Sequence, residues 1–277
     1  MPPRPTVLYV SDLSYPAKGR RYCDEDIYLT SHLRKAFDLA ICHPEDAAAL
    51  MRNFDTVVTR NSGPVIDYPT AYAHFRQQAE ATGQRVYNPL TGKADMAGKQ
   101  YLVDLTTQGY PVIPTVDDEA DLARLPQAGT YVVKPKAGAD SHGLEFVEAG
   151  DLQANVAQKA RTEFLIQPKI DFRYEVSFYF VDHDFQYALN APDPNQRWEL
   201  TNYTPTAEDL EFARKFVHWN DLGHGIQRVD ACRTESGDLL LVELEDLNPY
   251  LSLDRTSDET RTRFVEAMTA SIRGSLT

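Results

Sequence analysis

Four charged residues near the C-terminal end of the chain have the types and the spacing to bind metal and phosphate. The segment QRVDACRTESGDLLLVELED predicts a β-hairpin that turns at ESGD. Because successive strand residues point to opposite faces, Arg228 and Asp230 share one face of the first strand. Glu243 and Glu245 share one face of the second strand in the same way. Pairing of the two strands would therefore bring three carboxylates and one guanidinium together.

The surroundings of these carboxylates leave two interpretations open. The hairpin is expected to be at least half buried because of its apolar residues Val229, Leu241, Val242 and Leu244. Uncompensated buried carboxylates are costly, so they must pair with cations or bind a metal ion. Magnesium suits such a site, because it takes oxygen ligands and leaves room for nucleotide phosphates. A solvent-facing acidic stripe on an edge hairpin is the alternative.

Two lysines earlier in the chain are candidates for phosphate binding. Lys134 ends the apolar run YVV and is followed by a loop of small residues that contains Gly138, Ala139 and Gly143. The backbone N–H groups of such a loop can surround a phosphate, although glycine-rich turns are also common in ordinary hairpins. Lys99 is expected early in a helix, before YLVDL. Taken singly, each lysine is better explained as a solvated surface charge, and only the order of the motifs favours phosphate binding.

The segment FLIQPKIDFRYEVSF has the features of an adenosine pocket. Its apolar strand ends at Gln167 and continues into Pro168, Lys169 and Ile170, a connection whose backbone groups can hydrogen-bond adenine. Glu175 follows at a position where a carboxylate can accept hydrogen bonds from ribose hydroxyls. The alternative is an ordinary strand–turn–strand unit with an exposed glutamate.

Composition and cysteine content place the chain among globular, reduced proteins. Its 277 residues, 42% hydrophobic and 25% charged, suffice for a large core and predict about two domains. No segment approaches the roughly 20 apolar residues of a membrane span, and MPPRPTVLYV lacks the core of a signal peptide. Cys23, Cys42 and Cys232 have no metal-ligand spacing. We therefore expect a cytoplasmic protein without a membrane partner.

The net charge restricts the class of ligand. A formal charge of −13 and the lack of a basic cluster argue against nucleic acid as a partner. A nucleotide remains compatible with this charge, because a few lysines focused at one site, together with metal ions, can bind a triphosphate in an acidic protein.

The order of strand and helix patterns predicts a fold of mixed class, α/β and α+β. The first third alternates strands and helices, which indicates a small parallel sheet covered by helices. From about residue 115 the pattern becomes antiparallel, and a further α+β piece follows. We expect boundaries that give an N-terminal lobe, a linking helix and strand, a central lobe and a C-terminal lobe: 1–90, 91–114, 115–182 and 183–277.

Taken together, the motifs resemble those of the ATP-grasp superfamily over nearly the whole chain. The lysine before GYPVIPT, the VVKP strand with its small-residue loop, IQPKI, RVD and ELE occur in the family's order. The resemblance is strongest to the glutathione synthetase-like carboxylate–amine ligases; D-alanine–D-alanine ligase and the ribosomal-protein glutamate ligases are more distant. It implies that ATP binds between the central lobe, which carries the lid, and the C-terminal catalytic lobe, with the N-terminal lobe contributing to substrate binding.

The resemblance also implies a role for each matched residue. At the hairpin, Arg228 would stabilise the phosphorylated intermediate, Asp230 would bind magnesium and Glu243 would bridge two magnesium ions. The implied ATP contacts are Lys99 and Lys134 at the phosphates, Gly138, Ala139 and Gly143 in the lid, Gln167, Pro168, Lys169 and Ile170 at adenine, and Glu175 at ribose.

Two departures from the family pattern concern the metal site and the substrate loop. Glu245 stands where the family has asparagine, although Asn248 in LNP is near enough to substitute. The added negative charge suits manganese as well as magnesium. NPYLSLD replaces the family's Pro-Gly after the metal pair, so the substrate loop is altered.

The resemblance implies an ATP-dependent ligase that activates a carboxylate as an acyl phosphate and joins it to an amine or a thiol. We expect an amino acid or a short peptide as substrate, and a homodimer is compatible with the sequence. Arg60 in VVTRNSGP is a candidate for holding an acceptor carboxylate, with a surface loop arginine as the alternative. Arg197 in APDPNQRWEL is a candidate for covering the acyl site. An ATP-grasp kinase and a non-catalytic nucleotide-binding module are the alternative functions.

Overall fold

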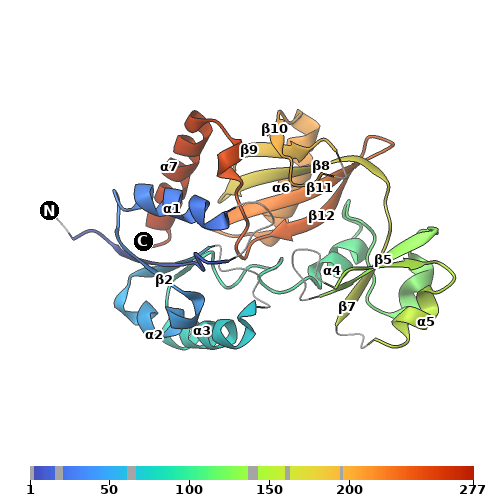
Figure 1. The fold of residues 1–277 in the computed structure, drawn as a ribbon, viewed down its shortest axis with the longest axis horizontal. Helices are drawn as coiled ribbons and strands as arrows, with labels where there is room; N and C mark the ends of the chain where they lie inside the picture. Colours follow the sequence, from blue (N-terminus) through green and yellow to red (C-terminus); the bar gives the residue numbers. More distant parts are fainter. Residues whose placement is uncertain (1–2, 16–20, 61–66, 137–142, 160–162, 194–195) are drawn as a thin grey trace.

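The N-terminal lobe is a parallel sheet covered by helices in the computed structural model (Figure 1), which describes residues 3–15, 21–60, 67–136, 143–159, 163–193 and 196–277. Its strand order is β2-β1-β3-β4, and each neighbouring pair is parallel. The alternating pattern of the sequence predicted this arrangement. The elements are β1 Thr6–Val10, α1 Tyr22–Leu33, β2 Asp38–Cys42, α2 Ala47–Leu50, β3 Thr56–Thr59, α3 Pro69–Thr82 and β4 Val86–Tyr87.

Local sequence sets the limits of α3. Pro69 occupies the start of the helix, where the missing N–H group is not needed. Gly83 ends the helix with a left-handed backbone, φ 64° and ψ 28°, which glycine adopts without steric cost. Both ends of α3 therefore follow from the residues found there.

The central lobe is an antiparallel sheet with the strand order β6-β5-β7. Its buried side chains form a separate small core that includes Val133, Val147 and Ile166. The linking helix α4 begins at Tyr101, so Lys99 precedes this helix instead of lying in it. The elements are α4 Tyr101–Thr107, β5 Thr130–Pro135, β6 Glu145–Glu148, α5 Leu152–Val156 and β7 Phe164–Pro168.

The C-terminal lobe contains the largest sheet of the described residues, with the order β10-β9-β8-β11-β12 and antiparallel pairing throughout. Helix α6 covers one face, while α7 lies beside the N-terminal lobe (Figure 1). The elements are β8 Phe172–Val181, β9 Asp184–Ala191, β10 Thr201–Tyr203, α6 Ala207–Asn220, β11 Ile226–Thr234, β12 Leu239–Glu245 and α7 Asp258–Gly274, with short 3-10 segments at Pro44–Asp46, Met51–Asn53, Glu119–Arg124 and Leu253–Arg255.

The placement of β8 corrects one expected boundary. The sequence reasoning put residues 172–181 in the central lobe, with the limit at 182, but β8 pairs with β9 and β11 in the C-terminal sheet. The physical reason is the apolar face of β8, whose Phe178 and Phe180 are fully buried in the core beneath α6. The linking strand expected within residues 91–114 is likewise reduced to a single bridge, from Val112 to Leu241.

A β-bulge in the predicted hairpin places Leu241 and Glu243 on opposite faces of the sheet. Asp230 pairs with Glu243 and Ala231 pairs with Leu241, so Val242 has no partner in the ladder. Without this bulge, Leu241 and Glu243 would point to the same face, because they are two residues apart. With it, Leu241 joins the core and Glu243 points to the opposite side.

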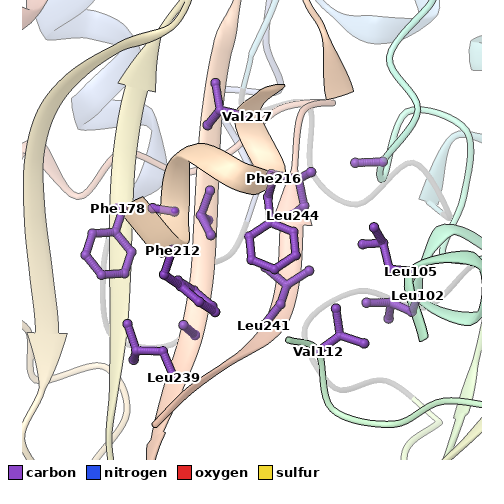
Figure 2. Close-up of a cluster of buried hydrophobic side chains, with 14 of the residues drawn as sticks. Leu102, Leu105, Val112, Phe178, Phe212, Phe216, Val217, Leu239, Leu241 and Leu244 are labelled. Atoms are coloured by element: carbon purple, nitrogen blue, oxygen red, sulfur yellow. The ribbon is translucent and has the colours of Figure 1, made fainter. Parts of the chain in front are cut away.

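The apolar face of the sheet packs against α6 and the linking segment. Figure 2 shows Phe212 and Phe216 of α6 over the sheet, with Leu102 and Leu105 of α4 close by. This packing anchors the segment that precedes α4 to the C-terminal lobe. None of the helices in the described part of the chain combines the length and the apolar character needed to cross a bilayer.

A close backbone approach at Gly92 generates the first prediction. A Cβ atom at Gly92 would overlap the carboxylate of Asp246, which accepts hydrogen bonds from the backbone N–H of Met96 at 2.7 Å and from Asn220 at 3.0 Å. Gly92→Ala should therefore lower the free energy of unfolding by about 1–3 kcal/mol, measured by urea denaturation.

Gly150 provides the matched control, because a Cβ atom there would meet no atom within 4 Å. Gly150→Ala should change the free energy of unfolding by no more than about 0.5 kcal/mol. Equal effects of the two substitutions would contradict the account of the linking segment.

Candidate active site

The face of the C-terminal sheet opposite α6 carries the charged residues predicted from the sequence. The ladder places Arg228 between Tyr179 and Glu245, one residue from each neighbouring strand. Asp230 lies in the same way between Ser177 and Glu243. The three carboxylates and the guanidinium therefore come together in this structure.

The guanidinium of Arg228 is held on three sides. It donates to both oxygens of Asp230, at 3.0 Å and 2.8 Å, and to Glu245 at 2.6 Å. Its remaining nitrogen donates to the backbone carbonyl of Tyr250 at 2.8 Å. Charge-assisted bonds from a planar fork fix orientation as well as position. Arg228 is therefore pre-oriented beside the carboxylates.

Glu245 stands where the resemblance predicts asparagine, and its negative charge is disfavoured by its surroundings. Burial raises the pKa of Glu245 to about 7, and the neighbouring carboxylates of Asp230 and Asp95 act in the same direction, while Arg228 opposes it. Desolvation disfavours an anion in this way wherever water is excluded. A cation placed between these carboxylates would restore the charged form.

Lys99 is the cation that occupies this position in the structure. Its ammonium contacts the Glu243 carboxylate and lies 3.8 Å from Asp95, and the side chain is 11% exposed. Lys99 thus reaches a carboxylate of the hairpin from the segment that precedes α4. Its backbone N–H also donates to the carbonyl of Lys136, just after β5, at 3.4 Å.

Asp95 is a site residue that the sequence reasoning missed. One oxygen each of Asp95, Glu243 and Glu245 lie within 4.8 Å of one another, a spacing that suits a metal ion. The Asp95 Oδ1 atom is buried and has no hydrogen-bond partner among the described residues, and burial raises the pKa of the Asp95 carboxyl. These oxygens fit a hard divalent cation such as Mg²⁺. The available signal was a single aspartate four residues before Lys99, which no motif singled out.

Lys134 lies on β5 within electrostatic range of this cluster. Burial lowers the pKa of its ammonium to about 8, and the positive charge of Lys99 contributes to this shift, while Asp95 opposes it. The structure therefore brings the two predicted lysines together from separate lobes. Two like charges held this close favour an anionic ligand between them.

The small-residue loop after Lys134 is described only at its end. Gly138 and Ala139 lie outside the described residues. Gly143 has a left-handed backbone, φ 73°, and a Cβ atom there would come within 2.8 Å of Pro135. Glycine is therefore required at this position by both conformation and space.

The expected adenosine segment forms the strand β7 and its exit. Gln167 is 4% exposed, and its side chain donates to Thr115 at 2.8 Å, so this side chain is engaged inside the protein. The backbone N–H of Lys169 donates to Thr130 at 3.0 Å. Pro168 ends β7, and Ile170, which is half-buried, lies just before β8. An adenine contact by this segment stays a prediction.

Glu175 and Arg197, predicted for ribose and for the acyl site, contact each other. Arg197 donates to the Glu175 carboxylate at 2.6 Å, and the two side chains are 53% and 20% exposed. Burial raises the pKa of Glu175, and the charge of Arg197 opposes that rise. A nucleotide at Glu175 would have to replace or share this ion pair.

Asn248 and Arg60, predicted for the metal site and for the acceptor carboxylate, lie next to each other. The Asn248 side chain donates to the backbone carbonyl of Arg60 at 3.3 Å. Arg60 is 1% exposed, which excludes a surface loop arginine, and its guanidinium pairs with Glu25 at 3.1 Å. A substrate contact by Arg60 and a metal contact by Asn248 stay predictions.

A pocket of about 430 Å³, counting its open mouth, lies at the carboxyl end of the parallel sheet. Ligands commonly bind at this end of such sheets. The hydroxyl of Thr59 in its wall is buried without a hydrogen-bond partner among the described residues. The pocket is mainly apolar, and its walls are formed by Val10, Pro44, Ala47, Thr59, Tyr68, Tyr72, Phe75, Leu247 and Asn248.

The fold resembles that of known ligases. The cycloserine biosynthesis protein DcsG of Streptomyces lavendulae is 24% identical over 261 aligned positions, which cover 82% of this chain and 87% of the relative. The crystal structure of D-cycloserine synthetase DcsG has a TM-score of 0.74 at 21% identity and covers 96% of this chain and 99% of that one. No protein-family model matches the chain.

Two further solved structures have the same arrangement. The ATP-grasp ligase PsnB, complexed with a phosphomimetic variant of its minimal precursor, Mg and ADP, has a TM-score of 0.66 at 16% identity, covering 96% of this chain and 98% of that one. D-alanine–D-alanine ligase of Bacillus anthracis, complexed with ATP, has a TM-score of 0.65 at 12% identity, covering 98% and 97%. The chain has the ATP-grasp fold, and the predicted resemblance to ATP-grasp ligases is confirmed.

The lowered pKa of Lys134 generates a prediction about pH. ATP phosphates favour the charged ammonium, so above a pH of about 8 binding must be accompanied by proton uptake. The affinity for ATP should therefore fall between about pH 7.5 and pH 9.5, by up to about tenfold per unit. Isothermal titration calorimetry in buffers of different ionisation enthalpy measures both the affinity and the proton uptake.

Lys134→Met is the matched variant, because it keeps the length of the side chain and removes the titrating group. It should bind ATP more weakly at neutral pH and lose the proton uptake. An unchanged proton uptake in this variant would show that another group titrates.

The unpartnered oxygen of Asp95 generates a prediction about metal affinity. In the presence of ADP, Asp95→Asn should bind Mn²⁺ at least about tenfold more weakly, because one anionic ligand is lost. Electron paramagnetic resonance of free Mn²⁺ measures this affinity. Asp171→Asn, at a carboxylate whose side chain is 89% exposed, should leave it unchanged. Equal Mn²⁺ affinity in both variants would remove Asp95 from the site.

Proposed function

We propose that the chain is an ATP-dependent ligase that activates a carboxylate as an acyl phosphate and joins it to an amine or a thiol. The observation that carries the proposal is the position of Arg228, which is pre-oriented by Asp230, Glu245 and the Tyr250 carbonyl. Transfer of a phosphoryl group requires cations that hold ATP. An acyl transfer also requires a cation for the negative charge that develops on the acyl oxygen.

The residues of the chain divide the reaction between them. Lys99 and Lys134 hold the phosphates of ATP, and a carboxylate oxygen of the substrate attacks the γ-phosphorus in line while ADP leaves. The amine of the second substrate then attacks the acyl carbon, loses a proton and displaces phosphate. Arg228 stabilises the oxyanion of this second step. In-line positioning accounts for most of the rate, since little covalent chemistry is left to the protein.

Magnesium would be held by Asp230, Glu243 and Glu245, the carboxylates predicted from the sequence, together with Asp95. When bound, it supplies positive charge at the β- and γ-phosphates. Lys99 would then exchange its contact with Glu243 for one with phosphate. Manganese fits the same oxygen ligands.

The apolar pocket of the N-terminal lobe supports an amino acid or a short peptide as substrate. Leu247 and Asn248 in its wall follow the end of the acidic hairpin at Glu245 by two and three residues, so the chain connects the pocket directly to the hairpin. Its walls suit an apolar side chain, with the Thr59 hydroxyl available to orient a polar group.

The cysteines Cys23, Cys42 and Cys232 are free, which supports the reduced, cytoplasmic setting expected from the sequence.

A screen of substrate pairs tests the proposed function. The protein is incubated with ATP, magnesium and pairs of L- and D-amino acids or dipeptides, and ADP release is followed with mass spectrometry of the products. The similar proteins are named for D-cycloserine, for D-alanine–D-alanine and for precursor peptides, which justifies D-amino acids and peptides in the panel. A condensed product that depends on both substrates supports the ligase.

Arg228→Lys distinguishes the two chemical steps. A lysine supplies a point charge but lacks the planar fork that contacts two carboxylates and a carbonyl. The variant should bind ATP as the unchanged protein does and form amide or thioester at least about a hundredfold more slowly. Equilibrium binding of ATP and product formation by mass spectrometry measure the two effects.

Two other outcomes of the substrate screen would favour a different function. A stable phosphorylated product without a new amide or thioester, in the unchanged protein, would favour a kinase. Nucleotide binding without turnover over the whole panel would favour a binding module.

A further inference from the structure

The segment that follows the acidic hairpin forms one side of the Arg228 site. Its Tyr250 carbonyl accepts the hydrogen bond from Arg228 at 2.8 Å. The position of this carbonyl therefore helps to fix the orientation of the Arg228 guanidinium. Asp230 and Glu245 fix the other edge of the fork from the sheet.

A carboxylate from the N-terminal lobe holds this segment. Glu25 of α1 accepts hydrogen bonds from the backbone N–H groups of Leu251 at 3.0 Å and Leu253 at 3.2 Å. The ring of Tyr22, one turn earlier on α1, lies 4.3 Å from the ring of Tyr250, between centroids. Helix α1 therefore contacts the segment on both sides of the carbonyl that receives Arg228.

Arg60 connects the same carboxylate to the same segment. Its guanidinium pairs with Glu25 at 3.1 Å and donates to the backbone carbonyl of Pro249 at 2.7 Å. The side chains of Arg60 and Glu25 are 2% and 3% exposed. A buried carboxylate of this kind depends on its cation and its amide donors, since water does not solvate it. The pair thus connects α1 and the residue that follows β3 to residues 249–253.

We propose that Glu25 and Arg60 are positioning residues for Arg228, which they orient through the Tyr250 carbonyl. This inference rests on the proposed role of Arg228 in ligation. It gives Arg60 a part in the reaction without contact to the substrate. The N-terminal lobe thereby contributes to acyl transfer from its own core.

The first arm of the test measures the guanidinium directly and needs no substrate. In protein labelled with ¹⁵N-arginine, Arg228→Lys assigns the signals of Arg228, and their exchange reports rotation of the guanidinium. Glu25→Gln should speed this rotation about tenfold, the factor that corresponds to one lost hydrogen bond. Unchanged rotation in a folded Glu25→Gln protein overturns the proposal.

The matched control is a second buried ion pair, between Arg233 and Asp209, whose side chains are 15% and 3% exposed. Arg233 lies on the same strand as Arg228, five residues further along. Asp209→Asn should leave the rotation of Arg228 unchanged, even where it lowers the melting temperature. An equal effect of the control on Arg228 shows that general loosening is responsible and overturns the proposal.

If Glu25→Gln does not fold, a second variant and a measurement on the unchanged protein still test the proposal. Arg60→Lys keeps the buried positive charge but cannot donate to Glu25 and Pro249 in the same geometry, so it should give an intermediate rotation rate. In the unchanged protein, the amides of Leu251 and Leu253 should be protected from hydrogen exchange. Exchange of these amides at the rate of an open loop overturns the proposal.

The second arm uses the substrate pair found by the screen. Glu25→Gln should lower kcat about tenfold to a hundredfold, the range expected for small misplacement of a catalytic group, with the KM for ATP unchanged. In the Arg228→Lys background, Glu25→Gln should have no further effect, because both changes act on one group. If the two substitutions lower kcat by factors that multiply in the double variant, the proposal is overturned. Absence of turnover in the unchanged protein would contradict the proposed ligase, and the first arm alone would then decide on the positioning role.

Discussion

The balance of charge around Arg228 and Lys99 is the constraint on which the rest of the site depends. Four carboxylates, Asp95, Asp230, Glu243 and Glu245, gather beside these two cations. Burial raises the pKa of Asp95 and of Glu245, so it disfavours their negative charge. Arg228 and Lys99 compensate part of that charge in the structure. The uncompensated negative charge of such a site attracts a divalent metal ion. Binding of that ion would free Lys99 to contact phosphate.

The three lobes supply this balance from different parts of the chain. The C-terminal sheet provides the hairpin, the segment before α4 provides Asp95 and Lys99, and β5 of the central lobe provides Lys134. The packing of α4 beside the C-terminal core keeps Asp95 and Lys99 close to the hairpin (Figure 2). The N-terminal lobe reaches the site through Glu25 and Arg60, which hold the backbone that contacts Arg228.

Much of this architecture could be predicted because it depends on short-range patterns. The alternation of apolar residues in the first third gives the parallel sheet, and the spacing of Arg228 with Asp230 and of Glu243 with Glu245 gives the charged face. The bulge at Val242 could not be predicted, since it depends on how Leu241 fits the core beneath α6. Asp95 was missed because Glu243 and Glu245 lie far away in sequence, and its spacing from Lys99 belongs to no motif. The Arg60–Glu25 pair was missed because its two residues are 35 positions apart.

The central claim is that a carboxylate is activated by transfer of phosphate, and the fate of its oxygen tests that claim most directly. A substrate whose carboxylate is labelled with ¹⁸O is incubated with the protein, ATP, magnesium and the acceptor, and the inorganic phosphate is analysed by mass spectrometry. Attack of the carboxylate on the γ-phosphorus predicts that one labelled oxygen appears in the phosphate for each amide or thioester formed. Product formation with unlabelled phosphate would contradict the account.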